Sequence, residues 1–120
     1  MKKFPRAAIK VDFGTEVRLG PGKVRLLEFI AETGSISEAA RQMEMSYRRA
    51  WLLIDEVNGI FGKPVVDTAT GGVGGGGAKI TPLGEAVIVA FRDIESEATG
   101  LIQAKLTKLL AQRRRVRRET

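Results

Sequence analysis

Apolar and polar side chains alternate near the start of the chain. Val11 and Phe13 fall on one face of this segment, and Val17 and Leu19 repeat the alternation. A two-residue loop would place Phe13 opposite a charged residue, whereas a three-residue loop at 14–16 pairs Val11 with Leu19 and Phe13 with Val17. We therefore predict a short β-hairpin with the longer loop and one buried face.

Three segments with helical spacing of apolar residues follow this hairpin. Pro21 suits the first turn of a helix, and Gly34 can take the left-handed conformation that closes one. Ser35, followed three residues later by a glutamate, forms a capping box that starts a short second helix. Ser46 is the predicted N-cap of a third helix that runs to about Phe61.

A second hairpin and a long helix complete the pattern. Residues 65–66 begin a strand that runs into the glycine-rich stretch 71–77, and residues 78–80 form the returning strand. Thr81 caps a final helix, predicted over 82–111, which Pro82 opens. The order indicates a mainly α fold with a small β content: a winged helix-turn-helix with an N-terminal β-hairpin, a glycine-rich wing and a long C-terminal dimerisation helix.

The positive charge of the chain is concentrated at its end. The net charge is +6, but residues 112–120 hold five arginines and one glutamate, while the other 111 residues hold 15 basic and 13 acidic side chains. We expect one domain over 1–111, followed by a disordered basic tail at 112–120. Any nucleic-acid site on the domain must then be a local patch.

The composition argues against an enzyme. The chain has no cysteine and no histidine, and its carboxylates are scattered, so no nucleophile–base pair can be assembled. We expect no metal and no cofactor. The basic start is not followed by the apolar region of a signal peptide, and no apolar run could span a bilayer, so we expect a cytoplasmic protein without a membrane partner.

The second and third helices have the features of a helix-turn-helix. Ala39, Ala40 and Ala50 supply the small side chains that two helices need where they cross closely. The turn between such helices often contains glycine. Here Glu44 occupies that region, and we expect the turn to close at some cost in backbone energy.

The third helix presents a polar, basic first turn. Its helical spacing puts Ala50, Ile54, Val57 and Phe61 on one face, predicted to be buried, and Arg48, Leu52 and Asp55 on the other. A recognition helix reads base edges with its N-terminal residues, and arginine pairs bidentately with guanine. The predicted DNA contacts are Ser35, Ser46, Tyr47, Arg48, Arg49, Leu52, Gly74, Gly75, Gly76 and Lys79.

Simpler interpretations of these residues stay open. The arginines could be solvated side chains of a plain three-helix bundle. Trp51 either packs against the hairpin or contacts DNA. The run from Gly72 to Gly77 matches the dinucleotide fingerprint only formally, because a strand and a proline follow it instead of a helix. It is either a flexible loop or a wing whose backbone approaches phosphates closely.

The last helix carries apolar residues at spacings of four, three, four and three, the pattern of a helix-pairing seam. One alternative is a helix that lies only on its own domain. A domain this small leaves the far end of the helix uncovered, so we expect a homodimer and a near-palindromic DNA site. The predicted interface residues are Val87, Phe91, Ile94, Ala98 and Leu101.

The basic tail leaves two further hypotheses. Its arginines could add phosphate contacts without sequence preference, which would make the chain an architectural nucleic-acid binder. Alternatively, the chain could be a protein-interaction module that binds its partner through the long helix and has lost DNA binding. Deleting 112–120 abolishes binding under the first alternative, whereas replacing Arg48 and Arg49 abolishes it for a sequence-specific regulator.

Several stretches resemble the N-terminal DNA-binding domain of the ModE family of molybdate-responsive transcription regulators. They are Gly34–Ala40, Met45–Trp51, Glu56–Asn58, Ala69–Ala78 and Thr81–Gly84. The resemblance covers about residues 20–95 and implies a dimeric regulator of double-stranded DNA, with Ser46–Arg49 in the recognition helix and Gly71–Lys79 in the wing. The molybdate-binding modules of that family have no counterpart in these residues. The sensor is then lost, supplied by a separate effector-binding protein, or part of a longer form of the chain, and the resemblance supports DNA binding only.

Overall fold

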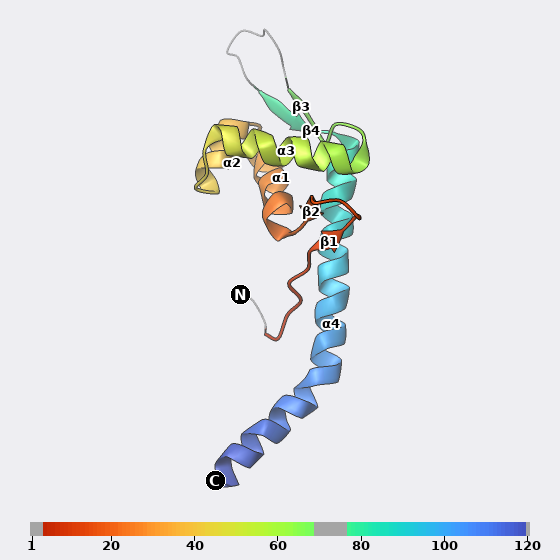
Figure 1. Ribbon diagram of the computed structural model, residues 1–120. Helices are drawn as coiled ribbons and strands as arrows, with labels where there is room; N and C mark the ends of the chain where they lie inside the picture. Colours follow the sequence, from red (N-terminus) through yellow and green to blue (C-terminus); the bar gives the residue numbers. More distant parts are fainter. Residues whose placement is uncertain (1–3, 69–76, 120) are drawn as a thin grey trace. The chain divides into compact units, whose positions relative to one another are not determined.

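The computed structural model describes residues 4–68 and 77–119, with side chains up to Arg113 (Figure 1). Two compact units are present: a body, Lys10–Phe91, and a second unit that combines the N-terminal residues up to Ile9 with the chain from Arg92. The elements follow the predicted order of hairpin, three helices, hairpin and long helix. The predicted fold class is confirmed.

The first hairpin pairs β1 (Val11–Asp12) with β2 (Arg18–Leu19). Val11 lies opposite Leu19, so the predicted register and its three-residue loop are confirmed. The strands are shorter than the alternating pattern. Leu19 is buried, but Phe13 is 44% exposed and meets the ring of Phe61 edge-on, with centroids 6.0 Å apart. The predicted buried face is thus only partly covered.

The helices α1 (Pro21–Thr33), α2 (Ile36–Gln42) and α3 (Tyr47–Phe61) pack against one another. Their caps are those that the sequence predicts. Gly34 is left-handed, with φ 67°, and donates its N–H to the carbonyl of Ile30. The Ser35 hydroxyl oxygen accepts from the N–H of Glu38, which is one half of the predicted capping box, whereas the N–H of Ser35 donates to the Thr33 hydroxyl and not to Glu38. The core that these helices enclose includes Val24, Leu27, Ile30, Ala39, Ala50 and Ile54.

The turn between α2 and α3 closes around a non-glycine residue. Glu44 has a φ of 55°, in the left-handed region, where an L side chain costs roughly 1–2 kcal/mol. Two main-chain hydrogen bonds of 3.0 Å hold the turn, from Glu44 to the carbonyl of Arg41 and from Met45 to that of Ala40. The predicted backbone strain is confirmed.

The second hairpin pairs β3 (Val66–Thr68) with β4 (Ala78–Ile80), with Val66 opposite Ile80. Two hydrogen bonds attach this wing to the helices. The N–H of Ala78 donates to the carbonyl of Gly34 at 2.9 Å, and the N–H of Val65 donates to Oδ1 of Asn58 at 2.8 Å. The base of the wing is therefore anchored at both strands.

The last helix, α4 (Pro82–Glu119), begins with the predicted cap. The Thr81 hydroxyl accepts from the N–H of Gly84 at 3.0 Å and donates to the carbonyl of Pro64 at 2.9 Å. A Cβ at Gly84 would lie only 2.3 Å from the carbonyl oxygen of Val65. Glycine at this position thus lets the first turn of α4 approach the strand that precedes it.

The predicted end of the last helix at 111 is wrong. The helix continues to Glu119, so the segment 112–120, predicted as a separate tail, starts inside α4. Arginine is a good helix former, and nothing in this segment breaks a helix. No helix in the described ranges is long and apolar enough to cross a membrane.

The residues of the predicted seam on α4 have different environments. Val87 and Phe91 are buried in the body, with 5% and 2% exposure, because they complete its own core. Both were predicted to contact a second copy, and the fold leaves them almost no surface for one. Ile94 and Leu101 are 45% and 58% exposed, and Ala98 is half-buried.

The second unit joins the N-terminal residues to α4. The N–H of Ala7 donates to the Thr99 hydroxyl at 2.9 Å, and the side-chain amide of Gln103 donates to the carbonyl of Pro5 at 3.0 Å. At about 100° per residue, Thr99 and Gln103 lie more than a quarter turn away from the line through Ile94 and Ala98. The N-terminal segment therefore binds a different face of α4 from the apolar seam.

Candidate nucleic-acid interface

The first turn of α3 is rigidly capped and open to solvent. The Ser46 hydroxyl oxygen accepts from the N–H of Arg49 at 3.0 Å, which satisfies one of the free donors of the helix start. Tyr47, Arg48 and Arg49 are all exposed. The capped turn therefore presents a phenol and two guanidinium groups that can reach a ligand without first breaking a contact of the core.

The two faces of α3 separate as predicted. Ala50, Ile54 and Val57 are buried, with 0–1% exposure, whereas Arg48 and Leu52 lie on the outer face. Phe61 departs from the predicted buried face, since it is 36% exposed at the end of the helix. The outer face thus combines a cation with an exposed apolar side chain, which are the groups that read guanine and the thymine methyl in a major groove.

Arg48 and Arg49 point in different directions from α3. They are neighbours in sequence, so about 100° separates them around the helix axis. Arg48 lies on the outer face next to Leu52, which is one turn further along. Arg49 lies on the flank and lines a pocket with Leu53. The two arginines therefore face different parts of a ligand that lies along α3.

Trp51 packs with its neighbour on α3. Its ring meets that of Tyr47 edge-on at 6.3 Å, and Trp51 is half-buried while Tyr47 is 52% exposed. Aromatic pairs of this geometry restrict both rings. We infer that Trp51 orients the Tyr47 phenol at the start of the helix.

The predicted contact Ser35 has a capping role at the start of α2. Its oxygen accepts from the main chain, while the hydroxyl hydrogen can still be donated. Ser35 follows Gly34, whose carbonyl binds the wing. The start of α2 and the wing are thus neighbours, and a phosphate at the wing would lie within reach of this serine.

Lys79 lies on the wing strand β4 and is exposed, with Asp67 as its partner across the hairpin. Gly74, Gly75 and Gly76, which were predicted to approach DNA, lie outside the described residues. The flanking strands show that the glycine stretch joins two antiparallel strands. It is therefore not the phosphate loop of a βαβ unit.

Sequence reasoning missed two residues that position the wing. In the sequence, Asn58 stands out only as part of a resemblance, and Gly34 only as a helix cap and as part of the same resemblance. Asn58 stands in the last turn of α3, where asparagine is a poor helix former. An amide in such a place often bonds a neighbouring segment, and this was the signal available in the sequence.

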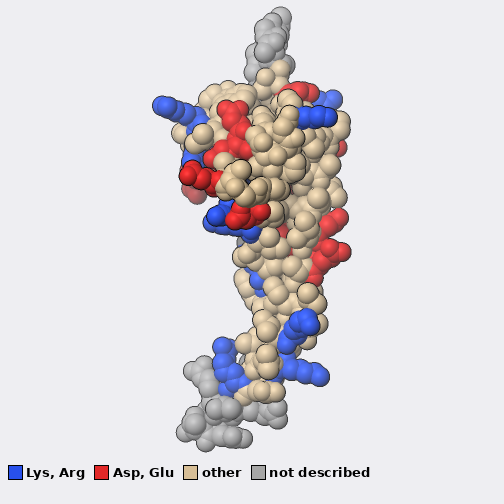
Figure 2. Space-filling model, turned by 45° about the vertical axis from the view of Figure 1, so that its right-hand side comes forward, with Lys and Arg blue, Asp and Glu red and all other residues tan. Residues whose placement is uncertain are grey.

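Charge on the body is mixed rather than uniform. Figure 2 shows acidic and basic side chains interspersed over the face of the body that it displays. Several are ion pairs, such as Arg25 with Glu28 and Arg41 with Glu38, both at 3.2 Å. This agrees with the sequence-based prediction that a nucleic-acid site on the body is a local patch.

Residues 22–85 match the family of bacterial regulatory helix-turn-helix proteins of the LysR type. The matched region covers just over half the chain, from α1 to the first turn of α4. The chain belongs to this family. Membership confirms the prediction of a regulatory helix-turn-helix protein rather than an enzyme.

Curated relatives confirm the resemblance to the ModE family. The molybdenum-pterin-binding protein MopB of Rhodobacter capsulatus is 43% identical over 97 residues, which cover 81% of this chain and 33% of that protein. The molybdenum transport protein ModE of Azotobacter vinelandii is 37% identical over 92 residues, covering 77% and 33%. The DNA-binding transcriptional dual regulator ModE of Escherichia coli K12 is 44% identical over 71 residues, covering 59% and 27%. The chain spans about a third of the length of these relatives.

Proposed function

We propose that this chain is the operator-reading part of a ModE-type transcription regulator that acts as a homodimer. The observation that carries the proposal is the outer face of α3, where Tyr47, Arg48 and Leu52 stand exposed on a capped helix beside an anchored wing. In this proposal Arg48 reads a guanine, Leu52 packs on a base edge, and Lys79 binds a phosphate at the wing.

The names of the relatives suggest which promoters to test. Several are named for molybdenum transport or molybdenum-pterin binding. We propose that the operators of this chain lie upstream of genes for molybdenum uptake or use. The proposal concerns DNA binding, and a separate effector-binding protein is proposed as a further partner. Because a regulator of this kind acts in the compartment that holds the DNA, we propose a cytoplasmic location.

The dimer is proposed from the exposed part of α4. Ile94 and Leu101 continue the seam that Val87 and Phe91 begin inside the body, and they leave an apolar stripe open to solvent. Leu109, 56% exposed, lies further along the helix. A second copy packed along this stripe would bury it and would place two recognition helices on a near-palindromic site.

Fluorescence anisotropy tests the proposal directly. The full chain is titrated with promoter fragments from the source genome and with a scrambled duplex, each at two salt concentrations. A preference of about 10³-fold or more for one fragment is expected, the range of specific binding. Equal, steeply salt-dependent binding to every duplex would instead favour an architectural binder that uses its C-terminal arginines.

A further inference from the structure

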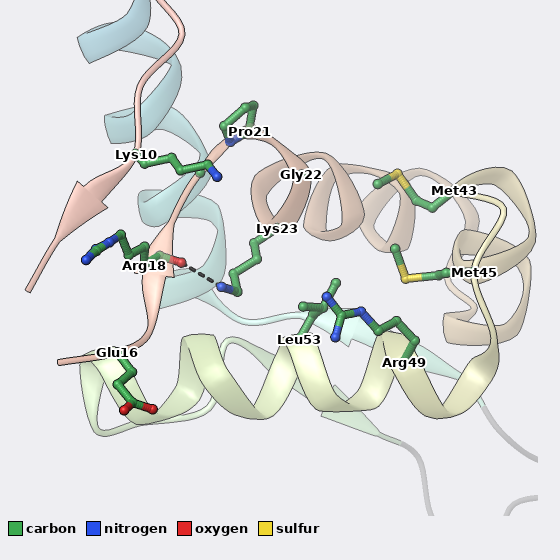
Figure 3. A pocket seen from close by; sticks show the side chains of 11 residues that line it. Lys10, Glu16, Arg18, Pro21, Gly22, Lys23, Met43, Met45, Arg49 and Leu53 are labelled. Carbon is green, nitrogen blue, oxygen red and sulfur yellow. Dashed lines mark hydrogen bonds between the residues drawn. The ribbon is translucent and has the colours of Figure 1, made fainter.

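An open pocket of about 530 Å³ lies on the body beside the recognition helix. It is formed where the segment before β1, the start of α1, the turn after α2 and the first turns of α3 meet (Figure 3). Four basic residues line it, against one acidic residue, Glu16. We call it the basic pocket, and its principal lining residues are Lys10, Lys23, Met43, Met45, Arg49 and Leu53.

Lys23 is the structural cation of the basic pocket. Its Nζ donates to the carbonyl of Arg18 at 2.6 Å and lies 3.5 Å from a carboxylate oxygen of Glu56. Its side chain is only 17% exposed. Lys23 therefore ties the first hairpin to α1 and α3, and its charge is already neutralised by Glu56. The Arg18 guanidinium pairs with Asp12 and points away from the pocket (Figure 3).

Lys10 and Arg49 are the free cations of the basic pocket. Neither the Lys10 ammonium nor the Arg49 guanidinium has a hydrogen bond or an ion pair within the residues described in 4–68 and 77–113, and both side chains are exposed. Figure 3 shows Lys10 extending toward the start of α1 and the Arg49 guanidinium lying over Leu53, while the Glu16 carboxylate is turned away. Two uncompensated positive charges thus face a pocket that has a partly apolar wall.

The basic pocket lies on one side of α3, where the phosphate backbone of a bound duplex would pass. Arg49 and Asn58 are nine residues apart, which is about two and a half helical turns, so they lie on opposite sides of the helix. Asn58 binds the wing. The wing and the basic pocket therefore flank α3 on its two sides, with Arg48 and Leu52 on the face between them. A helix of about 10–12 Å diameter fills a major groove about 12 Å wide, so a phosphate backbone passes on either side of it.

We propose that the basic pocket binds a DNA phosphate of the strand that runs on the side of α3 opposite the wing. Lys10 supplies a point charge to that phosphate and Arg49 a planar fork of donors, as phosphate contacts require. The contact positions the recognition helix and carries no base information. The proposal rests on the proposed DNA binding and assigns Arg49 to the backbone rather than to a base.

A DNA phosphate fits the basic pocket better than a free small anion. Both free cations are exposed, and the less exposed Lys23 is already paired with Glu56, so an isolated anion would be weakly held. A phosphate of a bound duplex is delivered by the other contacts of α3 and the wing, so two exposed cations suffice.

The test compares Lys10→Gln and the double variant Lys10→Gln/Arg49→Gln with Lys63→Gln, a matched control at the far end of α3. Anisotropy gives affinities for a duplex selected from a random pool and for a scrambled duplex over a range of salt. We expect the magnitude of the slope of log affinity against log salt to fall by about 0.9 per protomer in the double variant, the value for one neutralised phosphate, and equally on both duplexes. The preference between duplexes and the slope for Lys63→Gln should stay unchanged. An unchanged slope in the double variant, with folding verified by circular dichroism, would overturn the proposal.

A second experiment locates the DNA phosphate that the basic pocket binds. Single phosphates along each strand of the selected duplex are replaced by uncharged methylphosphonates. One position in each half-site should weaken the wild-type chain and have no effect on Lys10→Gln/Arg49→Gln. Weakening of both proteins at every position, or saturable binding of inorganic phosphate without any change in DNA affinity, would contradict the proposal. If no selected duplex emerges, the proposed function fails, while the salt slopes on the scrambled duplex still test the pocket.

Discussion

The side-chain oxygen of Asn58 accepts a hydrogen bond from the main-chain N–H of Val65 at 2.8 Å. Val65 is fully buried and directly precedes the first strand of the wing. The bond therefore fastens the wing to the helix whose opposite end is proposed to read DNA, so that helix and wing form one rigid surface.

Replacing Asn58 with alanine removes the acceptor of a buried N–H. We expect a loss of about 1–3 kcal/mol in the free energy of unfolding, the cost of an unsatisfied buried donor. DNA affinity should fall as well, because the wing loses an anchor. Urea denaturation and anisotropy measure the two effects.

The adjacent Gly59 provides the control for this change. A Cβ at Gly59 would meet nothing within 4 Å, so Gly59→Ala should raise stability by about 0.5–1 kcal/mol through helix propensity. If Asn58→Ala proved as stable as the wild type, the hydrogen bond to Val65 would have no role in holding the wing.

Gly84→Ala is expected to destabilise the body. The new Cβ would lie 2.3 Å from the Val65 carbonyl oxygen and 2.9 Å from a methyl group of Ile80, and the main-chain oxygen cannot move without shifting the strand. Overpacking of this kind costs about 1–3 kcal/mol. Thermal unfolding should show a lower midpoint. Gly100→Ala in the same helix, where the space is open, should not lower it.

Arg48 and Arg49 are expected to differ in DNA binding. Arg48→Ala should cost about 1–3 kcal/mol on the preferred duplex and relax the preference at one base pair, because it removes a base contact. Arg49→Ala should weaken all duplexes equally. A competition assay with single-base variants of the preferred duplex separates the two results. Equal loss of specificity in both variants would mean that both arginines read bases.

Leu101→Glu should convert the proposed dimer into monomers. A charge in the exposed part of the seam must be desolvated when two copies pack, and unpaired buried charges are strongly unfavourable. Light scattering after size exclusion would show half the mass. Val89→Glu is the control, because Val89 is as exposed (59% against 58%) but lies two residues after Val87, off the seam.

The dimer prediction has a clear contrary outcome. A Leu101→Glu chain that keeps the mass of the wild type would place the interface elsewhere. Phe91→Glu cannot serve this purpose, because Phe91 is 2% exposed in the core of the body and its replacement would unfold the body.

Local features of the fold could be predicted from the sequence with good accuracy. The caps at Gly34, Ser46 and Thr81 depend on side chains within a few residues of the bond that they satisfy. The register of the first hairpin follows from alternation within nine residues. The end of α4 was predicted too early, because the basic composition of residues 112–120 was taken to indicate disorder although arginine favours helices.

The environment of each site residue could not be predicted without the tertiary structure. Val87 and Leu101 occupy the same position of the heptad pattern, yet Val87 is buried in the body and Leu101 is exposed. The pattern does not reveal where the body ends along α4, because only the fold determines that. Sequence placed Arg48 and Arg49 together in a basic turn, whereas the tertiary structure puts Arg49, but not Arg48, in a pocket that Lys10 and Lys23 also line. The sequence by itself determined the elements, their caps and the class of protein, because those depend on short-range patterns. Only the tertiary structure decided which charges are neutralised and which remain free to bind, because that depends on segments brought together from distant parts of the chain.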